Sequence, residues 1–307
     1  MDNPNSSLLN NSTLKVGIIG LGAIGCLISS QIPTNTQVYA LPSNPNLNRI
    51  KFQLEANKQS RQYSFNVWQG QSLDVIIICC KATQCLSALE LWQSAIGKSS
   101  QIVLLQNGMG QHEQVASLFP NNVIYAASTT EGAYKKSGAD NSVQHIIHAG
   151  HGITQWGHYG PEHRATEALK LDLSSLQGEH KWHDNIIDVL FAKLAINAVI
   201  NALTVKYNCP NGDLIYNPVI AQELENLCFE TESFFMAMKW PLDFKLIDKA
   251  QFIAELTAKN ISSMLQDVRA LRKTEIDFIN GYLLNKAKTI NYPLPKNQQL
   301  FDEIKSR

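Results

Sequence analysis

The sequence predicts an α/β domain built on a parallel sheet, followed by an all-α domain. A short apolar stretch, 15–19 (KVGII), leads directly into the glycine turn 20–25 (GLGAIG). Apolar stretches then alternate with helical patterns, which is typical of βαβ units and a parallel sheet. From about Ile186 onward only helical patterns follow, so the domain boundary falls near Asp184. We therefore expect a flexible tail over 1–14, an α/β domain over 15–184 and a helical domain over 185–307.

The elements of the α/β domain follow in order. The segment after the glycine turn, 26–30, continues as a helix, and the pattern at 82–95 predicts a second helix. Short continuous apolar runs, typical of buried parallel strands, occupy 36–41, 72–80, 101–105 and 123–128. Two more strand patterns, 143–147 and 153–156, flank the turn 150–152 and suggest an antiparallel extension of the sheet. Breaks in the later helical pattern fall near 209–212 and 240–241.

Composition excludes several classes of protein. The 26 Lys and Arg residues balance the 26 Asp and Glu residues and no basic run occurs, so we expect no nucleic-acid partner. No stretch approaches the roughly 18 consecutive apolar residues of a membrane helix, so no membrane partner is expected. The segment 1–14 is polar and lacks the apolar core of a secretory signal. The 6 scattered cysteines, with no CxxC pair, favour a reducing, cytoplasmic location.

The glycine turn has the GxGxxG spacing of a Rossmann dinucleotide-binding site. The first glycine permits a tight turn, the second lets the backbone approach a pyrophosphate, and the third lets the helix pack on the strand. The N–H groups at the start of the following helix remain free for phosphate oxygens. A purely structural glycine-rich turn is the alternative. The residues expected to bind the cofactor here are Gly20, Leu21, Gly22, Ala23, Ile24 and Gly25.

The end of the second strand indicates which dinucleotide is bound. NAD-selective sites place an acidic residue about 20 residues after the glycines, on the ribose hydroxyls. No acid occurs between Gly25 and Glu55, so the sequence favours NADP(H). No arginine stands there either. Ser43 can donate one hydrogen bond to a 2′-phosphate, and Arg49 and Lys51 are the nearest cations.

A polar stripe runs along the otherwise apolar segment 190–203, which we expect to be a buried helix. Lys193, Asn197 and Asn201 are four residues apart and lie within about 80° of one another on a helix. A buried lysine is unfavourable unless it is paired. The stripe therefore indicates one wall of a polar site. A solvent-facing stripe is the alternative, although asparagine is a poor helix former for that purpose.

The segment 260–277 is a second candidate wall. If it forms one helix, Asn260, Ser263 and Glu275 lie within about 120° of one another. Glu275 stands between Thr274 and Ile276 and would then face inward. A charged surface helix with ordinary ion pairs is the alternative.

Lys81 and Asn107 follow apolar strand patterns in the first domain. Open α/β sheets bind their ligands at the carboxyl ends of the strands, so both residues are candidates for the same site. The alternatives are a solubilising lysine and a turn-forming Asn-Gly pair.

The histidines at 145, 148 and 151 resemble a metal-binding tract, but we expect no metal site there. In a strand, the side chain of residue 148 points away from those of 145 and 151. The sequence also contains no paired Cys/His ligand spacing and no Gly-x-Ser-x-Gly elbow, so neither zinc nor hydrolase chemistry is predicted.

Several motifs together make the chain resemble the ketopantoate reductase (2-dehydropantoate 2-reductase) family over nearly its whole length from Lys15. The motifs are GLGAIG at 20–25, Lys81, QNGMG at 106–110, STTEGA at 128–133, KLAINAVINALT at 193–204, NCPNG at 208–212 and NISSMLQDVRALRKTEIDFINGYLL at 260–284. The last motif is long and highly specific. The resemblance implies a Rossmann domain, a helical C-terminal domain and an active site between them.

The resemblance also implies roles for individual residues. Lys193 is the expected catalytic acid, and Glu275 is expected to position that lysine and the cofactor. The expected substrate contacts are Asn107, Lys193, Asn197, Asn201, Asn211, Asn260 and Ser263. The expected cofactor contacts outside the glycine turn are Ser43, Lys81, Asn107, Ala133 and Glu275. Two positions depart from the family pattern: Ser43 stands where many members have arginine, and Glu131 where some have histidine.

The reaction that the resemblance implies is NADPH-dependent reduction of 2-dehydropantoate to (R)-pantoate, a step of pantothenate (vitamin B5) biosynthesis. The partner is then a small 2-keto acid, and the chain acts as a monomer or homodimer. A β-hydroxyacid dehydrogenase and a paralogous reductase of another 2-keto acid are the alternative enzymes. A regulator that senses NADP without turnover is the non-enzyme alternative.

Overall fold

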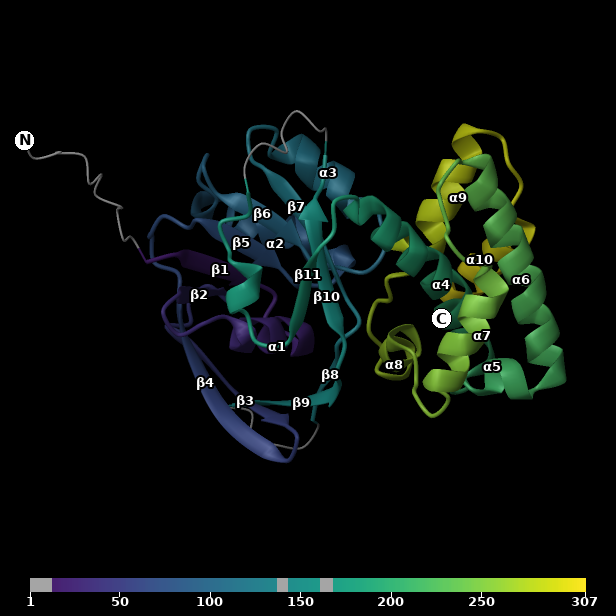
Figure 1. The fold of residues 1–307 in the computed structure, drawn as a ribbon, viewed down its shortest axis with the longest axis horizontal. Helices are drawn as coiled ribbons and strands as arrows, with labels where there is room; N and C mark the ends of the chain where they lie inside the picture. The colour runs from purple at the N-terminus through teal and green to yellow at the C-terminus, as the bar shows by residue number, and fades with distance from the viewer. Residues whose placement is uncertain (1–12, 137–142, 161–167) are drawn as a thin grey trace, which may run out of the picture.

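The computed structural model describes residues 13–136, 143–160 and 168–307. Within these residues the chain forms a sheet-containing part and a helical part that lie side by side (Figure 1). The last strand, β11, ends at Trp182, and the long helix α4 begins at Ile186. Residues 1–12, most of the expected flexible tail, lie outside the described residues.

One sheet of eleven strands organises the first part, in the order β11-β10-β7-β6-β5-β1-β2-β4-β3-β9-β8 among the described residues. The strands are β1 (Lys15–Ile19), β2 (Gln37–Leu41), β3 (Arg49–Ala56), β4 (Gln59–Val67), β5 (Val75–Ile78), β6 (Gln101–Leu104), β7 (Ile124–Thr129), β8 (Gly132–Lys135), β9 (Gln144–Gly150), β10 (Ile153–His158) and β11 (Glu179–Trp182). The central strands β7, β6, β5, β1 and β2 are parallel, as predicted. Every residue of β5 and β6 is buried, which explains their mostly apolar sequences.

Helix α1 (Ala23–Gln31) begins inside the glycine turn and is enclosed by the sheet. It contacts β1, β3, β8 and β9, so the sheet curves around it (Figure 1). Two more helices of this part are α2 (Cys85–Leu91) and α3 (Gln111–Leu118). The helix predicted over 82–95 is divided, because 3₁₀ turns at Ala82–Gln84 and Gln93–Ala95 flank α2.

The sheet contains four strands that were not predicted, β3, β4, β8 and β11, and its pairing also differs from the prediction. Residues 42–71, for which no strand was predicted, contain the antiparallel hairpin β3–β4. Buried and less buried residues alternate along β3, as in a strand with one face in the core. The strands β9 and β10 do not pair with each other: β9 joins β3 and β8, whereas β10 pairs antiparallel with β7. Only β10 therefore extends the central strands in the predicted antiparallel manner.

The second part is helical, as predicted. Its helices are α4 (Ile186–Tyr207), α5 (Asp213–Tyr216), α6 (Pro218–Ala237), α7 (Leu246–Leu256), α8 (Ser263–Arg269), α9 (Asn280–Thr289) and α10 (Pro295–Lys305). Helix α4 is central, because it contacts α5, α6, α7, α8 and α10. It ends at Tyr207, and the left-handed φ of 49° at the next residue, Asn208, stops the helix near the predicted break. Among the described residues, α4 alone is long and apolar enough to span a membrane, but 61% of its apolar window is buried in the protein, as in a core helix.

The segment 260–277 is not one helix, so that prediction is wrong. Helix α8 ends at Arg269, and Leu271 adopts a left-handed φ of 53° that terminates the helix. A separate 3₁₀ turn follows at Ile276–Phe278. Glu275 therefore reaches its position from a loop rather than from the helix that carries Ser263.

Candidate active site

The glycine turn connects β1 to α1 at the carboxyl edge of the central strands. A Cβ at Gly25 would lie 2.1 Å from the Gly20 carbonyl oxygen, so the helix and the turn are in contact. By contrast, no heavy atom lies within 4 Å of a Cβ built at Gly22. Helix α1 begins at this open position with no side-chain cap and no acidic residue in its first turn, which leaves its N–H groups for phosphate oxygens. The residues present therefore fit a dinucleotide.

Two alanine substitutions in the turn are expected to have different effects. Gly20 has a φ of +86°, and a Cβ there would lie 2.2 Å from the Cys80 nitrogen, so Gly20→Ala should lower the unfolding free energy by more than about 1 kcal/mol. Gly22→Ala should change it by less than about 0.5 kcal/mol, since the added methyl group meets open space. It should nevertheless weaken dinucleotide binding. Urea unfolding and a fluorescence titration with NADPH measure the two effects, and equal destabilisation by both variants would contradict this interpretation.

Three neighbouring parallel strands end at the candidate site. Lys81 and Ala82 follow β5, Asn107 follows β6, and Thr129 is the last residue of β7. This edge is where open α/β sheets bind ligands. The structure therefore brings the predicted residues Lys81 and Asn107 to the edge that also carries the glycine turn.

The turn that contains Asn107 is pressed against the helical part. Met109 N donates to the Phe278 carbonyl oxygen at 2.7 Å. A Cβ at Gly108, whose φ is +79°, would lie 2.4 Å from the same oxygen. Glycine is thus needed both for the turn and for the close approach of the two parts.

Lys193 extends from α4 toward the end of β7. Its Nζ donates to the Thr129 carbonyl oxygen at 2.7 Å, so the side chain crosses from the helical part to the sheet. Burial lowers the pKa of the Lys193 ammonium from 10.5 to about 8, and the Glu275 carboxylate opposes this change by raising it. The group therefore keeps its proton at neutral pH and can release it readily.

The Glu275 carboxylate binds the ends of two adjacent strands. Its Oε1 accepts from Ala82 N at 3.0 Å, and its Oε2 accepts from Asn107 Nδ2 at 3.2 Å. Burial raises the pKa of Glu275, whereas these two hydrogen bonds and the Lys81 ammonium lower it. One side chain thus orients Asn107 and acts electrostatically on Lys193.

Asp267 completes this group, although the sequence reasoning did not select it. It lies buried on α8, forms an ion pair with Lys81 and accepts from Arg272 Nε at 3.0 Å. Its spacing could have identified it, because Asp267 is four residues after Ser263, on the same face of a helix. Lys81 and Glu275 are therefore both held by contacts between the sheet and the helical part.

The asparagines of the polar stripe lie one and two turns beyond Lys193 on α4. Asn197 is half-buried and Asn201 is buried, and neither side chain has a hydrogen-bond partner among the residues that the structure describes. Ser263 is the first residue of α8 and is exposed. The hydroxyl groups of Ser262 and Thr204 are 2.6 Å apart, which places the start of α8 beside α4. The side chains of Asn197, Asn201 and Ser263 are therefore free to bind a ligand.

Four more predicted residues lie on other loops and strands. Asn211 is buried, and its Nδ2 donates to Thr257 Oγ1 at 2.8 Å. Its N–H donates to the Asn260 carbonyl oxygen at 3.0 Å, so Asn211 fixes the loop that carries the exposed Asn260. Ala133 lies on β8, paired with β9, and Ser43 is exposed in the loop after β2.

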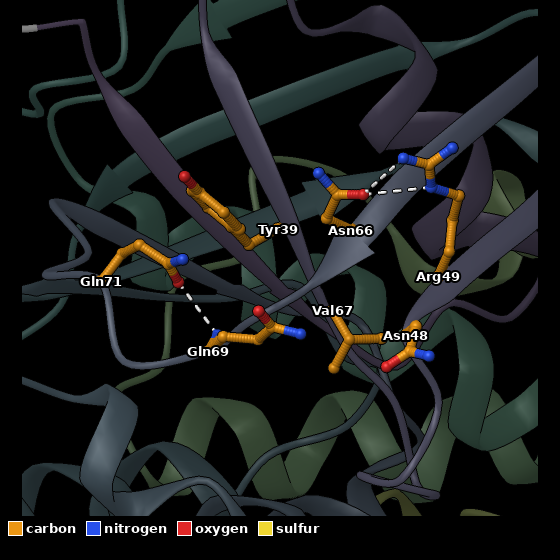
Figure 2. Close-up of a pocket in the computed structure, with 7 residues that line it drawn as sticks. All are labelled: Tyr39, Asn48, Arg49, Asn66, Val67, Gln69 and Gln71. Atoms are coloured by element: carbon orange, nitrogen blue, oxygen red, sulfur yellow. Dashed lines mark hydrogen bonds between the residues drawn. The ribbon is translucent and has the colours of Figure 1, made fainter.

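A polar pocket lies on the sheet beyond β2 (Figure 2). Its lining consists of Tyr39, Asn48, Arg49, Asn66, Val67, Gln69 and Gln71. Arg49 Nε and Nη2 donate to Asn66 Oδ1 at 3.0 and 2.9 Å, and Asn66 pairs in register with Tyr39 of β2. One of the two cations that the sequence indicated, Arg49, is therefore held over β4, the strand next to β2.

The fold and these contacts define a class of protein. It is an oxidoreductase with a dinucleotide-binding domain and a helical domain, and the helical domain supplies the ammonium group of Lys193. The family model described as "Ketopantoate reductase PanE/ApbA" matches residues 16–161, and "Ketopantoate reductase PanE/ApbA C terminal" matches 185–307. The 2-dehydropantoate 2-reductase of Shigella flexneri is 35% identical over 235 residues, covering 76% of this chain and 74% of the relative. That of Yersinia pestis is 31% identical over 307 residues, covering 96% and 95%. The chain belongs to the ketopantoate reductase family.

Solved structures have the same fold. The probable 2-dehydropantoate 2-reductase of Bacillus subtilis has a TM-score of 0.78 and 24% identity, and the match covers 95% of this chain and 99% of the other. A D-mandelate dehydrogenase with NADH and anilino(oxo)acetate has a TM-score of 0.81 and 23% identity, with 95% and 97% coverage. These likenesses confirm the predicted fold class. Membership of the ketopantoate reductase family makes this chain an oxidoreductase.

Proposed function

We propose that the protein reduces the C2 carbonyl group of 2-dehydropantoate (ketopantoate) to give (R)-pantoate, with NADPH as the reductant, in pantothenate biosynthesis. The observation that carries this proposal is the position of Lys193. Its ammonium group reaches from α4 to the end of β7, beside the two strand ends that Glu275 holds. The names of relatives at up to 35% identity support the choice of substrate.

Lys193 supplies the acid that this reaction needs. A bound nicotinamide provides the hydride, and hydride addition builds negative charge on the carbonyl oxygen of the substrate. An ammonium group stabilises such a charge and then donates its proton. Lys193 is suited to this because burial brings its pKa to about 8 while Glu275 holds the proton on it. Glu275 is thus a positioning residue for Lys193 and for the cofactor.

The neutral polar side chains orient the substrate. Asn197 and Asn201 can hydrogen-bond to uncharged substrate oxygens without adding a charge that competes with Lys193. Ser263, at the start of α8, can donate to the substrate carboxylate. Asn107 lies between cofactor and substrate, and Asn211 acts through the loop of Asn260, whose backbone it holds.

We propose NADP(H) rather than NAD(H) as the cofactor. The stretch between Gly25 and Glu55 contains no acidic residue that would repel a 2′-phosphate. Ser43 can donate one hydrogen bond to that phosphate. Arg49, which hydrogen-bonds to Asn66 opposite Tyr39, adds positive charge near the carboxyl end of β2. Lys81, Ala133 and the glycine turn complete the proposed cofactor contacts.

The cofactor preference is expected to exceed about tenfold in favour of NADPH, because one hydrogen bond to a charged phosphate contributes about 1.5 kcal/mol or more. Ser43→Arg should raise the preference further, since an arginine fork binds phosphate better than a hydroxyl group. The ratio of kcat/KM for NADPH and NADH, together with the Kd of each cofactor measured by fluorescence, checks both statements. A wild-type ratio below about tenfold would show that Ser43 has relaxed the selectivity.

The reaction itself is tested by following NADPH absorbance with the purified protein and ketopantoate. A screen of 2-keto acids and 3-hydroxy acids separates the proposed activity from its alternatives. Oxidation of 3-hydroxy acids with NAD would identify a β-hydroxyacid dehydrogenase. Reduction of another 2-keto acid in preference to ketopantoate would identify a paralogous reductase. Binding of NADPH without turnover of any of these compounds would indicate a regulator.

We also propose a cytoplasmic location and a small 2-keto acid as the partner. All six cysteines, which lie in the described part of the chain, are free thiols, as suits a reducing compartment. We propose that the chain acts as a monomer or a homodimer. Light scattering of the purified protein distinguishes these two states.

A further inference from the structure

Three side chains with metal-ligand chemistry come together outside the active site described above. Glu131 lies between β7 and β8, His148 on β9 and His151 between β9 and β10. One ligand atom from each lies within 4.8 Å of the other two, and the centroids of the two imidazole rings are 4.4 Å apart. The expectation that 148 and 151 face opposite ways is wrong, because β9 ends at Gly150 and the chain turns there. The reason for excluding a metal at this tract therefore does not hold.

Two of the three ligands are buried and already oriented. The side chains of His148 and Glu131 are 7% and 3% exposed. Glu131 Oε2 accepts from Gly152 N at 3.2 Å and lies 2.5 Å from His148 Nε2, while its Oε1 accepts from Gln31 Nε2 at 3.4 Å. Burying the negative charge of a carboxylate is unfavourable unless the charge is paired or hydrogen-bonded. A bound metal cation can pair with the Glu131 carboxylate, as a protonated partner can.

The third ligand, His151, is exposed at the rim of the group. Its Nε2 lies 3.1 Å from Asn57 Oδ1, an atom that only accepts hydrogen bonds. In a neutral ring this bond leaves Nδ1 with a free lone pair. Metal-binding histidines usually have this arrangement, with the second ring nitrogen donating to an oxygen. The exposed rim also provides access from solvent and room for a water molecule as a fourth ligand.

We propose that Glu131, His148 and His151 form a binding site for a divalent transition-metal ion of the zinc class. Two imidazole nitrogens and one carboxylate oxygen suit Zn²⁺, Co²⁺ or Ni²⁺, whereas Mg²⁺ and Ca²⁺ prefer oxygen ligands throughout. The ion takes the place of the proton between His148 Nε2 and Glu131 Oε2, and that proton leaves to solvent. The ligand atoms then draw to about 2.0–2.2 Å from the metal.

The proposed ion connects two turns that border the acceptor of Lys193. Glu131 N donates to Thr129 Oγ1 at 3.1 Å, and Thr130 N donates to the Ile153 carbonyl oxygen at 3.0 Å. Thr129 is the residue whose carbonyl oxygen accepts from Lys193. The metal therefore has a structural role: it stabilises the backbone that positions Lys193 and takes no part in the reduction.

The test is a titration of the chelator-treated full chain with Co²⁺, followed by visible absorption, and with Zn²⁺, followed by thermal unfolding. We expect one ion per chain and a higher Tm with Zn²⁺, since an ion that binds the folded state stabilises it. His151→Ala removes the exposed ligand and leaves the buried Glu131–His148 pair, so it should weaken Co²⁺ binding at least about tenfold. His145→Ala, in the same tract but outside the three-residue group, is the matched control and should bind like the wild type.

Glu131→Gln is the second variant, because it preserves the shape of the side chain while removing the anionic ligand. It is expected to lose Co²⁺ affinity as His151→Ala does. The proposal is overturned if the wild type binds neither ion, or if His145→Ala and His151→Ala bind equally well, since ordinary surface histidines would then explain the binding. None of these results depends on the reductase reaction, which the assay with NADPH and ketopantoate tests separately.

Discussion

Replacing Lys193 with alanine is expected to lower kcat at least about a hundredfold, which is within the range that general acids usually contribute. The variant lacks the ammonium group that reaches the end of β7, so a developing alkoxide is neither stabilised nor protonated. Binding of NADPH should change much less, because the glycine turn remains intact. Initial rates of NADPH oxidation with ketopantoate give kcat, and a fluorescence titration gives the Kd of NADPH.

Thermal unfolding separates loss of catalysis from loss of folding in this variant. Burial lowers the pKa of Lys193, which means that the folded state disfavours the ammonium form. Lys193→Ala should therefore unfold at the same or a higher temperature at pH 7. Lys206→Ala is the matched control: it removes a lysine that lies on the same helix and pairs with Glu223, and kcat should stay near the wild-type value. Near-normal turnover by Lys193→Ala would exclude the assigned role.

Replacing Glu275 with glutamine is expected to shift the pH dependence of kcat. In the wild type, Lys193 must be protonated to act as an acid, so kcat should fall as the pH rises through about 8. Glu275 raises the pKa of Lys193, so loss of its charge lowers that pKa and moves the alkaline limb to lower pH. Well above pH 8, kcat should then be about tenfold lower for each unit by which the pKa of Lys193 falls.

The pH profile distinguishes this effect from a merely structural one. A structural defect would lower kcat equally at every pH, whereas loss of the Glu275 charge should be least harmful in acid, where Lys193 stays protonated. Asp277→Asn is the matched control: Asp277 is an exposed carboxylate two residues away that pairs with Lys305. It should leave the profile in place. An unshifted alkaline limb in Glu275→Gln would refute the electrostatic role.

Local patterns in the sequence were sufficient for the elements that carry the site. The strand Lys15–Ile19 and the helix Ile186–Tyr207 lie where the patterns placed them. A buried parallel strand is a short apolar run, and a buried helix is apolar on nearly every face, so neighbouring residues reveal both. The polar residues Lys193, Asn197 and Asn201 were conspicuous because they interrupt such a helix.

The partners of these residues could not be predicted in the same way. Lys193 donates to Thr129, and Lys81 pairs with Asp267, yet the members of each pair are far apart in the chain. Their contact depends on how the helical part docks against the sheet. The prediction that one helix leads from Asn260 to Glu275 was wrong because Leu271 adopts a left-handed conformation. Leucine rarely takes this conformation, so no local preference in the sequence indicates the end of α8 there.

The sequence by itself determined the central parallel strands, the glycine turn, the helical second part and the identity of the polar residues on α4, because hydrophobic patterning acts between neighbours in the chain. Only the tertiary structure decided that Glu275 binds two strand ends at once, that Asp267 faces Lys81, and that His148 and His151 meet at Glu131. The pKa of Lys193 belongs to this second group. It depends on burial between the two parts and on a carboxylate from a distant loop, and both exist only once the chain has folded.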